Sequence, residues 1–458
     1  MSVVASPGLG DSLASQRTRT LAVLWTTYGS FYFCRANFGP ARSAIQRDLG
    51  FTALEIGFVL GAVKLGYALG QLINGQLTER FGARRILGVG MLGSSAATLL
   101  FAAAPWLSQA PAARGVVGPI ASVARAIMAW VGVDVAASGP LALMLLLAFT
   151  NGWFQAAGWP PCVKIASRWF PLEHRGRTMG ILGTSYTVGS GLAIFAVGAL
   201  LDASGGAWRV AFIAPAVVLA VSCANMALRL REHPPDDDGV ARAAPAADRI
   251  PLRESLAATL GNGRVWVLAL GLFGLDAVRY GFLDWAPGHL AEVHGTGALS
   301  AALKTAVFPL AGALGALSSG WVTDRFFDSR RAPVCALLLG GVGGLTLAYR
   351  GVVGLGAAPT VVCLALVGFC LFGAQILLVG TAAQDFARRG ATAAAAGFVD
   401  FTGHVGAFSG DVVTGWVLKR HGWGGAIVWW ASAAFVSSAL VATLWRARPG
   451  DASPTAAR

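Results

Sequence analysis

A short charged stretch occurs twice in this chain, first as GQLTERFGARR (residues 75–85) and then as GWVTDRFFDSRR (residues 320–331). The two copies begin 245 residues apart (320 − 75), and each follows a long apolar segment. Two arginines inside apolar segments, Arg35 and Arg279, repeat at nearly the same spacing of 244 residues (279 − 35). Two unrelated features that share one offset indicate an internal repeat, so the sequence predicts two similar halves.

The composition is that of a membrane protein. The 458-residue chain is 55% hydrophobic and only 12% charged, whereas soluble domains have roughly a quarter charged residues. Apolar stretches of about 20 residues recur along the whole length, and each is long enough to cross a bilayer as a helix. Backbone polar groups in lipid must be satisfied within the protein, which favours helices. We therefore expect an all-α polytopic protein whose solvent is the lipid bilayer.

Hydropathy and the positions of Arg, Pro and Gly predict twelve transmembrane helices in two pseudo-symmetric six-helix halves. The expected spans are 20–45, 53–77, 85–104, 139–166, 178–202, 208–230, 265–290, 301–323, 333–350, 358–385, 393–418 and 424–445. The corresponding division of the chain is a tail at 1–19, a first half at 20–230, a polar linker at 231–264, a second half at 265–445 and a tail at 446–458. Residues 107–138 are too broken by Pro and Gly for a span, so we expect a hairpin or an interfacial helix there.

The distribution of arginines predicts the orientation. Clusters such as Arg84–Arg85, Arg330–Arg331 and Arg388–Arg389 all fall between spans on the side where both termini would lie. By the positive-inside rule this side is cytoplasmic, so we expect an inner-membrane protein with both termini inside. The net charge of +13 is spread over these short clusters and forms no continuous basic face, which argues against nucleic acid as a partner.

The repeated charged stretch resembles the loop signature between the second and third helices of the major facilitator superfamily, with Glu79 in place of the usual Asp. Two further stretches, GWFQAAGWPPC (152–162) and RYGFLDW (279–285), look like the organophosphate:phosphate antiporters, which include glycerol-phosphate and hexose-phosphate carriers. The similarity runs from about Tyr28 to Trp430. The resemblance implies the fold of that superfamily and the exchange of phosphorylated metabolites.

In that family, one arginine in the first helix and one in the seventh are understood to hold the substrate phosphate, and Arg35 and Arg279 match these places. Two other positions depart from the glycerol-phosphate carriers. Tyr186 stands where they have a histidine, and Gln71 stands where they have a lysine, while Lys64 lies two turns earlier in the same helix. Anion binding is compatible with these changes, but they do not identify the substrate.

The depth of the two arginines supports the same role on physical grounds. Each lies about 15 residues into its span, or roughly 22 Å along a helix. A guanidinium keeps its proton there, and its insertion costs at least about 2.5 kcal/mol, so it needs a partner, a cavity or a ligand. Its planar fork matches phosphate oxygens. The structural alternative is an ion pair, since Asp276 lies one turn from Arg279.

Other polar groups within the spans are candidates for substrate contact. Lys64 is too deep to reach the membrane surface and is expected at the cavity. The remaining candidates for binding substrate hydroxyls, each equally suited to hold helices together, are Tyr32, Tyr186, Gln155, Trp159, Tyr280 and Gln375.

Two further groups are candidates for gating or coupling. Acidic and basic residues of the repeated stretch, namely Glu79, Arg80, Asp324 and Arg325, are expected to form a latch at the cytoplasmic ends of the helices. In the eleventh span, Asp400, His404 and Asp411 are spaced by 4 and 7 residues and therefore share a helix face. Asp400 and His404 could relay protons, or these acids and Asp276 could balance the charge of the arginines.

The sequence contains no Walker A loop, no His-Glu-x-x-His and no Gly-x-Ser-x-Gly. We therefore expect no enzyme activity, no cofactor and no metal. The favoured function is a monomeric secondary transporter that moves a small organic phosphate in exchange for inorganic phosphate by alternating access. Two alternatives remain, namely proton-coupled transport of another organic anion and a transporter-like sensor of a phosphorylated sugar.

Overall fold

The computed structural model describes residues 9–111, 114–130, 139–170, 172–234, 252–328, 330–382, 386 and 392–447. No strand occurs in these ranges. The helices are α1 (Leu9–Phe31), α2 (Phe38–Leu49), α3 (Ala53–Phe81), α4 (Ala83–Leu107), α5 (Arg114–Trp130), α6 (Gly139–Gln155), α7 (Trp159–Trp169), α8 (Leu172–Ala203), α9 (Val210–Arg229), α10 (Leu252–Leu260), α11 (Gly263–Tyr280), α12 (Ala286–His294), α13 (Ala298–Phe326), α14 (Arg331–Val352), α15 (Ala357–Ile376) and α17 (Thr392–Ala442). Shorter turns are η1 (Tyr32–Cys34), η4 (Gly281–Trp285), η5 (Val353–Leu355) and η6 (Leu377–Ala382).

These helices provide twelve crossings. Ten helical segments of the described chain are long and apolar enough to span a membrane. One of them, Ala394–Ala442, contains two spans joined at Gly422, where φ is 62° and ψ is −169°. Only glycine adopts this backbone conformation without strain, so the chain reverses direction there. Helix α1 completes the twelve, and the all-α polytopic fold is confirmed.

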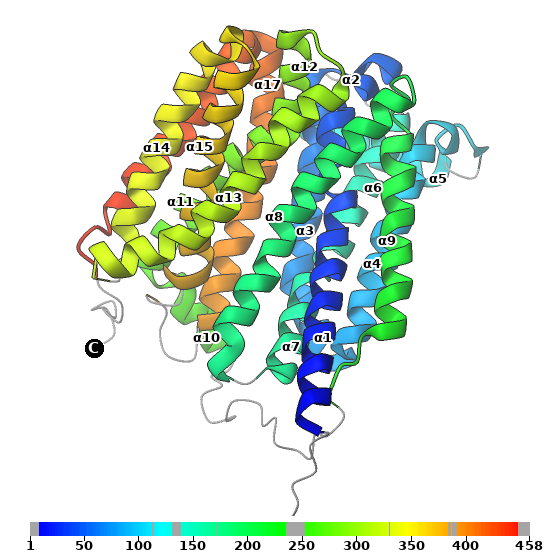
Figure 1. Ribbon diagram of the computed structural model, residues 1–458. Coiled ribbons are helices and arrows are strands. Elements are labelled where there is room, and N and C mark those ends of the chain that lie inside the picture. Colours follow the sequence, from blue (N-terminus) through cyan, green and yellow to red (C-terminus); the bar gives the residue numbers. More distant parts are fainter. Residues whose placement is uncertain are drawn as a thin grey trace, which may run out of the picture.

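The helices lie side by side in one bundle (Figure 1). The start of α1 and the end of α17 lie at one end of the bundle, which we call the terminal end, and α2 and α12 lie at the opposite end, which we call the far end. The first half comprises α1 to α9 and the second half α11 to α17. The halves meet where α8 packs on α13 and where α3 packs on α17. Helix α5, in the predicted insertion, lies at the side of the bundle near α6.

Glycines bring helices of each half into backbone contact. A Cβ atom placed on Gly66 of α3 would lie 2.1 Å from the carbonyl oxygen of Phe149 in α6. The second half repeats this arrangement, since a Cβ atom on Gly315 of α13 would lie 1.9 Å from the carbonyl oxygen of Phe369 in α15. Small residues allow such close approach in membranes, where packing and not hydrophobic burial holds helices together. The internal repeat is therefore visible in the packing.

Polar contacts connect the halves at the far end. Arg42 of α2 forms an ion pair with Glu292 of α12, with 3.0 Å between Nη2 and Oε1. Asp202, at the end of α8, accepts hydrogen bonds from the backbone amides of Ala298 and Leu299 at the start of α13. From these contacts α8 and α13 diverge toward the terminal end (Figure 1). These contacts hold the two halves together at the far end.

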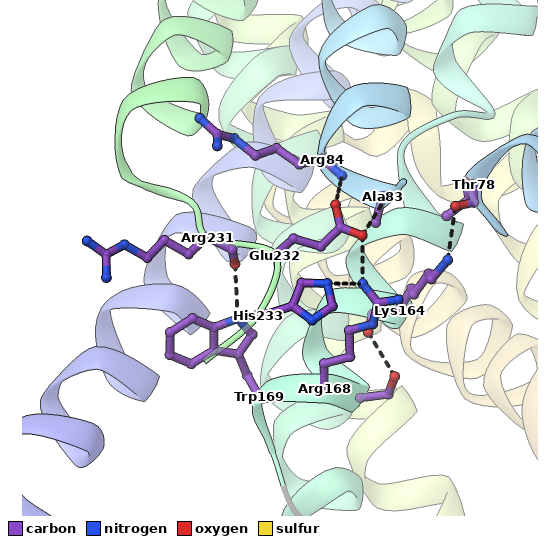
Figure 2. Close-up of polar contacts among 10 residues, drawn as sticks. Thr78, Ala83, Arg84, Lys164, Arg168, Trp169, Arg231, Glu232 and His233 are labelled. Atoms are coloured by element: carbon purple, nitrogen blue, oxygen red, sulfur yellow. Dashed lines mark hydrogen bonds and ion pairs between the residues drawn. The ribbon is translucent and has the colours of Figure 1, made fainter. Parts of the chain in front are cut away.

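At the terminal end of the first half, one carboxylate connects the segment after α9 with α4 and α7 (Figure 2). Glu232, just after α9, accepts hydrogen bonds from the amides of Ala83 and Arg84 at 3.1 and 3.2 Å. It also forms an ion pair with Arg168 of α7, whose Nη1 lies 2.6 Å away. Partial burial raises the pKa of Glu232, but these three donors outweigh burial, so the pKa lies below its ordinary value. A negative charge at the start of α4 also interacts favourably with the helix dipole.

The glycine contact between α3 and α6 gives a first prediction. Gly66→Ala should lower the thermal midpoint of the purified protein, because overpacking costs about 1 to 3 kcal/mol. Gly75→Ala in the same helix is the matched control, since a Cβ atom there would meet nothing within 4 Å. It should leave the midpoint unchanged or raise it, because alanine favours helix by about 1 kcal/mol over glycine. Equal midpoints for the two variants would contradict the packing described here.

The Glu232 cluster gives a second prediction, with a definite pH dependence. A carboxyl group whose pKa is lowered by folding stabilises the protein above its unfolded pKa, and this contribution disappears as the pH falls through the folded pKa. Glu232→Gln should therefore lower the thermal midpoint near neutral pH, and the difference from the parent should shrink in acid. A difference that stays constant with pH would contradict an ionised Glu232.

Candidate functional site

The two membrane arginines lie where their helices are interrupted. The predicted span 20–45 is not one continuous helix, because α1 ends at Phe31, a 3-10 turn follows, and α2 begins at Phe38. Arg35 lies within this break. Arg279 lies in the last turn of α11, directly before the π-helical turn Gly281–Trp285. Interrupted helices line cavities in transporters, and π-turns are frequent at functional sites. The repeat therefore places one arginine beside a break in each half.

Arg35 is surrounded by aromatic rings. Its Cζ lies 4.2 Å from the ring centroid of Tyr67 and 4.9 Å from that of Tyr32. Its Nη1 donates a hydrogen bond to the Tyr32 hydroxyl at 3.2 Å. Within the described residues no carboxylate lies at ion-pair distance from Arg35. Cation–π contacts stabilise the charge only in part, so the guanidinium is available to an anion.

Arg279 has an acidic neighbour but only a weak contact with it. Its Nε lies 3.3 Å from Oδ1 of Asp276, one turn earlier in α11. Neither of these two atoms has a hydrogen-bond partner of proper geometry among the described residues. The Cζ of Arg279 also lies 4.4 Å from the ring centroid of Tyr280. The carboxylate of Asp276 therefore does not occupy the fork of this guanidinium in the bidentate manner.

The two arginines line one cavity between the halves. Tyr186 of α8 and Phe372 of α15 lie on its walls, and the Tyr186 ring is 6.2 Å from the Tyr32 ring. A second cavity adjoins the first, and both are bordered by Arg35 and Tyr280. The second cavity is also lined by Lys64, Tyr67, Asn37 and His404. The site as a whole combines fixed positive charge, phenol hydroxyls and aromatic faces, which suits a small anion that also has hydroxyl groups.

Lys64 lies between two carboxylates of the opposite half. Its Nζ is 2.5 Å from Oδ2 of Asp284 in η4 and 2.9 Å from Oδ2 of Asp411 in α17. Trp285 donates a hydrogen bond from Nε1 to Oδ1 of Asp411 at 3.0 Å. All three charged side chains are buried. Lys64 therefore links the halves instead of standing alone in the cavity.

Asp400 and His404 lie in the first span of α17, closer to its start than Asp411 does. The His404 ring stacks on Tyr67 with centroids 4.4 Å apart, and its Nδ1 lies 2.9 Å from the backbone oxygen of Asp400. A carbonyl oxygen can only accept, so Nδ1 bears the hydrogen. The carboxylate Oδ2 of Asp400 lies 3.8 Å from the same nitrogen. His404 therefore borders the second cavity, with Asp400 one turn away, whereas Asp411 contacts Lys64 further along the helix.

Three of the predicted substrate-binding residues lie elsewhere. The Nε2 of Gln155 donates to the Phe31 carbonyl and the Ser94 hydroxyl, which joins α6 to α1 and α4. The Trp159 ring packs against Tyr28 at 4.9 Å. The Oε1 of Gln375 is buried and has no hydrogen-bond partner among the described residues. None of these three side chains lines the two cavities just described. Their substrate contacts stay a prediction.

The predicted latch residues lie at the terminal end. The side chain of Glu79 falls outside the described residues, and Arg80 and Arg325 are exposed. Asp324 is exposed and lies 3.7 Å from Arg331 at the start of α14. In the first half the ion pair at this end is made by Glu232, which sequence reasoning missed. Its only signal was a lone acid beside the arginine at the start of the linker.

Sequence reasoning also missed two residues of the site and the partner of a third. Tyr67 follows Lys64 by three residues and so faces the same side of α3. Asp284 follows Arg279 by five residues, and the π-turn between them directs it toward Lys64. Asp411 was placed on the face of His404 but without its lysine partner. The helical spacing of Tyr67 from Lys64 could have identified the first of these residues.

Comparison with known proteins supports the fold and the family. The chain is 28% identical to the glycerol-3-phosphate transporter of Bacillus subtilis over 447 residues, which cover 94% of this chain and 92% of that protein. It is 24% identical to a probable hexose phosphate transport protein of Chlamydia trachomatis, over 94% of this chain and 91% of that protein. It is also 26% identical to the membrane sensor protein UhpC of Salmonella typhimurium, over 93% of this chain and 90% of that protein.

A solved structure shares the fold. A bacterial homolog of the human lysosomal transporter Spinster, in an inward-facing and unoccupied conformation, superposes with a TM-score of 0.68 at 18% identity. The superposition covers 96% of this chain and 95% of that chain. The sequence pattern of one family matches residues 24–411, which include both halves. The chain is therefore a multi-pass membrane protein that belongs to the Major Facilitator Superfamily.

Proposed function

We propose that this protein moves a small phosphorylated organic anion, similar to glycerol phosphate or a sugar phosphate, across the inner membrane in exchange for inorganic phosphate. The observation that supports this function best is the pair of arginines, one from each half, at a single cavity. Arg35 has no carboxylate partner in the described part of the chain, and Arg279 has only a poorly aligned one. A phosphate group supplies the missing acceptors and the missing charge.

The tyrosines around the arginines suit the organic part of such a substrate. Tyr32, Tyr186 and Tyr280 line the cavity, and a phenol hydroxyl both donates and accepts hydrogen bonds, as sugar and glycerol hydroxyls do. The named relatives include transporters of glycerol 3-phosphate and of hexose phosphate. We therefore place the phosphate between Arg35 and Arg279 and the hydroxyls against the tyrosines.

The transport cycle follows from the contacts between the halves. Contacts of Arg42 with Glu292 and of Asp202 with α13 at the far end fit a conformation whose cavity opens toward the terminal end, which we expect on the cytoplasmic side from the arginine distribution. Rocking of the halves about the site would open the other side. The two guanidiniums repel one another in an empty site, so an anion between them lowers the energy of the closed intermediate. This favours exchange over one-way movement.

A second function is favoured by one relative. The membrane sensor protein UhpC is as similar to this chain as the named hexose phosphate transporter. A sensor would bind the same phosphate at the same arginines without moving it. Uptake of labelled glycerol phosphate and hexose phosphate into proteoliposomes loaded with inorganic phosphate separates the two, because a sensor binds the ligand but shows no counterflow.

The arginine pair gives the third prediction. Arg35→Lys and Arg279→Lys should each fold normally but reduce phosphate exchange in proteoliposomes by an order of magnitude or more, because lysine keeps the charge but loses the planar fork. Inorganic phosphate should also protect the parent against thermal unfolding, by about 2.7 kcal/mol at a hundredfold excess over its dissociation constant. Each lysine variant should lose this protection.

Arg47→Lys is the matched control, since Arg47 belongs to the same half but is exposed near the far end. It should exchange phosphate at the parent rate and keep the thermal protection. The proposal fails if a well-folded double variant with lysine at both 35 and 279 still exchanges phosphate as the parent does.

A further inference from the structure

Lys64, Asp284 and Asp411 form a buried cluster beside the two arginines. Their relative exposures are 5%, 3% and 1%, so water screens these charges poorly. The lysine belongs to the first half and the two carboxylates to the second. The cluster therefore bridges the interface between the two halves, which must move relative to each other during transport.

The charges of this cluster do not balance. Two ionised carboxylates and one ammonium leave one uncompensated negative charge, and a buried unpaired charge is expensive. The Lys64 Nζ donates a hydrogen bond to Asp284 at 2.5 Å. Asp411 accepts from Trp285 at Oδ1, but its Oδ2 has only the ion-pair contact with Lys64 and no hydrogen bond of proper geometry among the described residues. That buried oxygen is the place where a proton would restore neutrality.

Among the described residues, no neighbouring cation other than Lys64 lies at ion-pair distance from these two carboxylates. Arg279 is beside Asp276 in α11, and Tyr280 of the same helix presents its ring to Lys64 at 4.7 Å. On the other side, Arg42 of α2 lies 5.2 Å from the Trp285 ring but is paired with Glu292. From α3, Lys64 contacts both carboxylates, and Gly57 lies close to the backbone of Asp411. The two carboxylates thus share a single lysine.

The same imbalance holds for the whole site. Its fixed cations are Arg35, Arg279 and Lys64, whereas its carboxylates in the described chain are Asp276, Asp284, Asp400 and Asp411. A phosphate monoester adds between one and two further negative charges. The lining itself is positive, with three cations and Asp284, but the three carboxylates behind it make the site as a whole negative once an anion binds.

We propose that Asp411 is a proton-binding site, facing Lys64 and Asp284, and that this proton accompanies the anion through the transport cycle. The step is the transfer of one proton from hydronium on the open side to a carboxylate oxygen of Asp411, and the later return of that proton to water on the other side. Opening of the far end must separate Lys64 from both carboxylates, so movement of the halves changes the affinity of Asp411 for the proton. The coupling to an anion rests on the proposed function, whereas the proton site itself does not.

Infrared spectroscopy of the purified protein in D₂O tests the proton site directly, because a protonated carboxyl group absorbs at a different frequency from an ionised carboxylate. We expect an acid band in the parent near neutral pH that is lost in Asp411→Asn. It should be lost equally in Asp284→Asn, because the remaining carboxylate then pairs one-to-one with Lys64. Lys64→Gln should strengthen the band. Asp328→Asn, at a side chain that is 92% exposed, is the matched control and should leave the band unchanged.

An acid band that survives in both Asp411→Asn and Asp284→Asn, with thermal midpoints like that of the parent, would overturn the proton site. So would a band that disappears only in Asp400→Asn, since the proton would then belong to the Asp400 and His404 pair. If Asp411→Asn does not fold, Asp284→Asn and the increase in Lys64→Gln decide the question alone.

The coupling is measured in proteoliposomes. In proteoliposomes without internal phosphate, where uptake is net movement and not exchange, a pH difference of one unit, acidic outside, should support up to about tenfold accumulation of phosphate for one coupled proton, since tenfold corresponds to 1.4 kcal/mol. The ratio of gradient-driven uptake to phosphate exchange should fall to the background in Asp411→Asn and stay at the parent value in Asp328→Asn. An unchanged ratio in Asp411→Asn overturns the coupling. If the parent exchanges no phosphate, the proposed function fails, while the infrared result still decides the proton site.

Discussion

A guanidinium keeps its proton at every depth of a membrane, so an arginine within a span is a fixed positive charge that the rest of the protein must accommodate. Two such charges, Arg35 and Arg279, border one cavity of this protein, one from each half. Arg35 is accommodated mainly by tyrosine rings, and Arg279 by a tyrosine ring and the poorly aligned Asp276. Neither set of contacts fully compensates the positive charge, so both arginines still require an anion. The breaks in the helices, the aromatic walls and the buried acids can all be understood as consequences of this constraint.

The geometry of the halves places these charges together. Backbone contacts at Gly66 and Gly315 make each half a tightly packed unit, so relative movement is expected between the halves and not within them. Arg42 and Glu292 hold the halves together at the far end. Closer to the centre, Lys64 binds two carboxylates of the opposite half. Both sets of contacts must be broken when the far end opens, which connects the charge state of the site to its conformation.

The twelve spans and the two arginines could be predicted from the sequence because they depend on local properties. Hydropathy identifies each span, and the shared offset of the repeated stretch and of Arg35 and Arg279 reveals the two halves. The break at Tyr32–Cys34 could not be predicted, because the apolar pattern continues through it. The partners of Lys64 could not be predicted either, since Asp284 lies 220 residues away in the chain. Gln155 was equally suited to substrate and to packing, and only the structure shows its bonds to Phe31 and Ser94.

The central claim is that one phosphate group is held by both halves at once. Solid-state NMR can measure it directly, with ³¹P in bound inorganic phosphate and ¹⁵N in the arginine side chains of the membrane-embedded protein. If both arginines hold the phosphate, phosphorus should show dipolar coupling to two guanidinium groups, one lost in Arg35→Lys and the other in Arg279→Lys. Coupling to a single guanidinium, or coupling that survives in both variants, would contradict it.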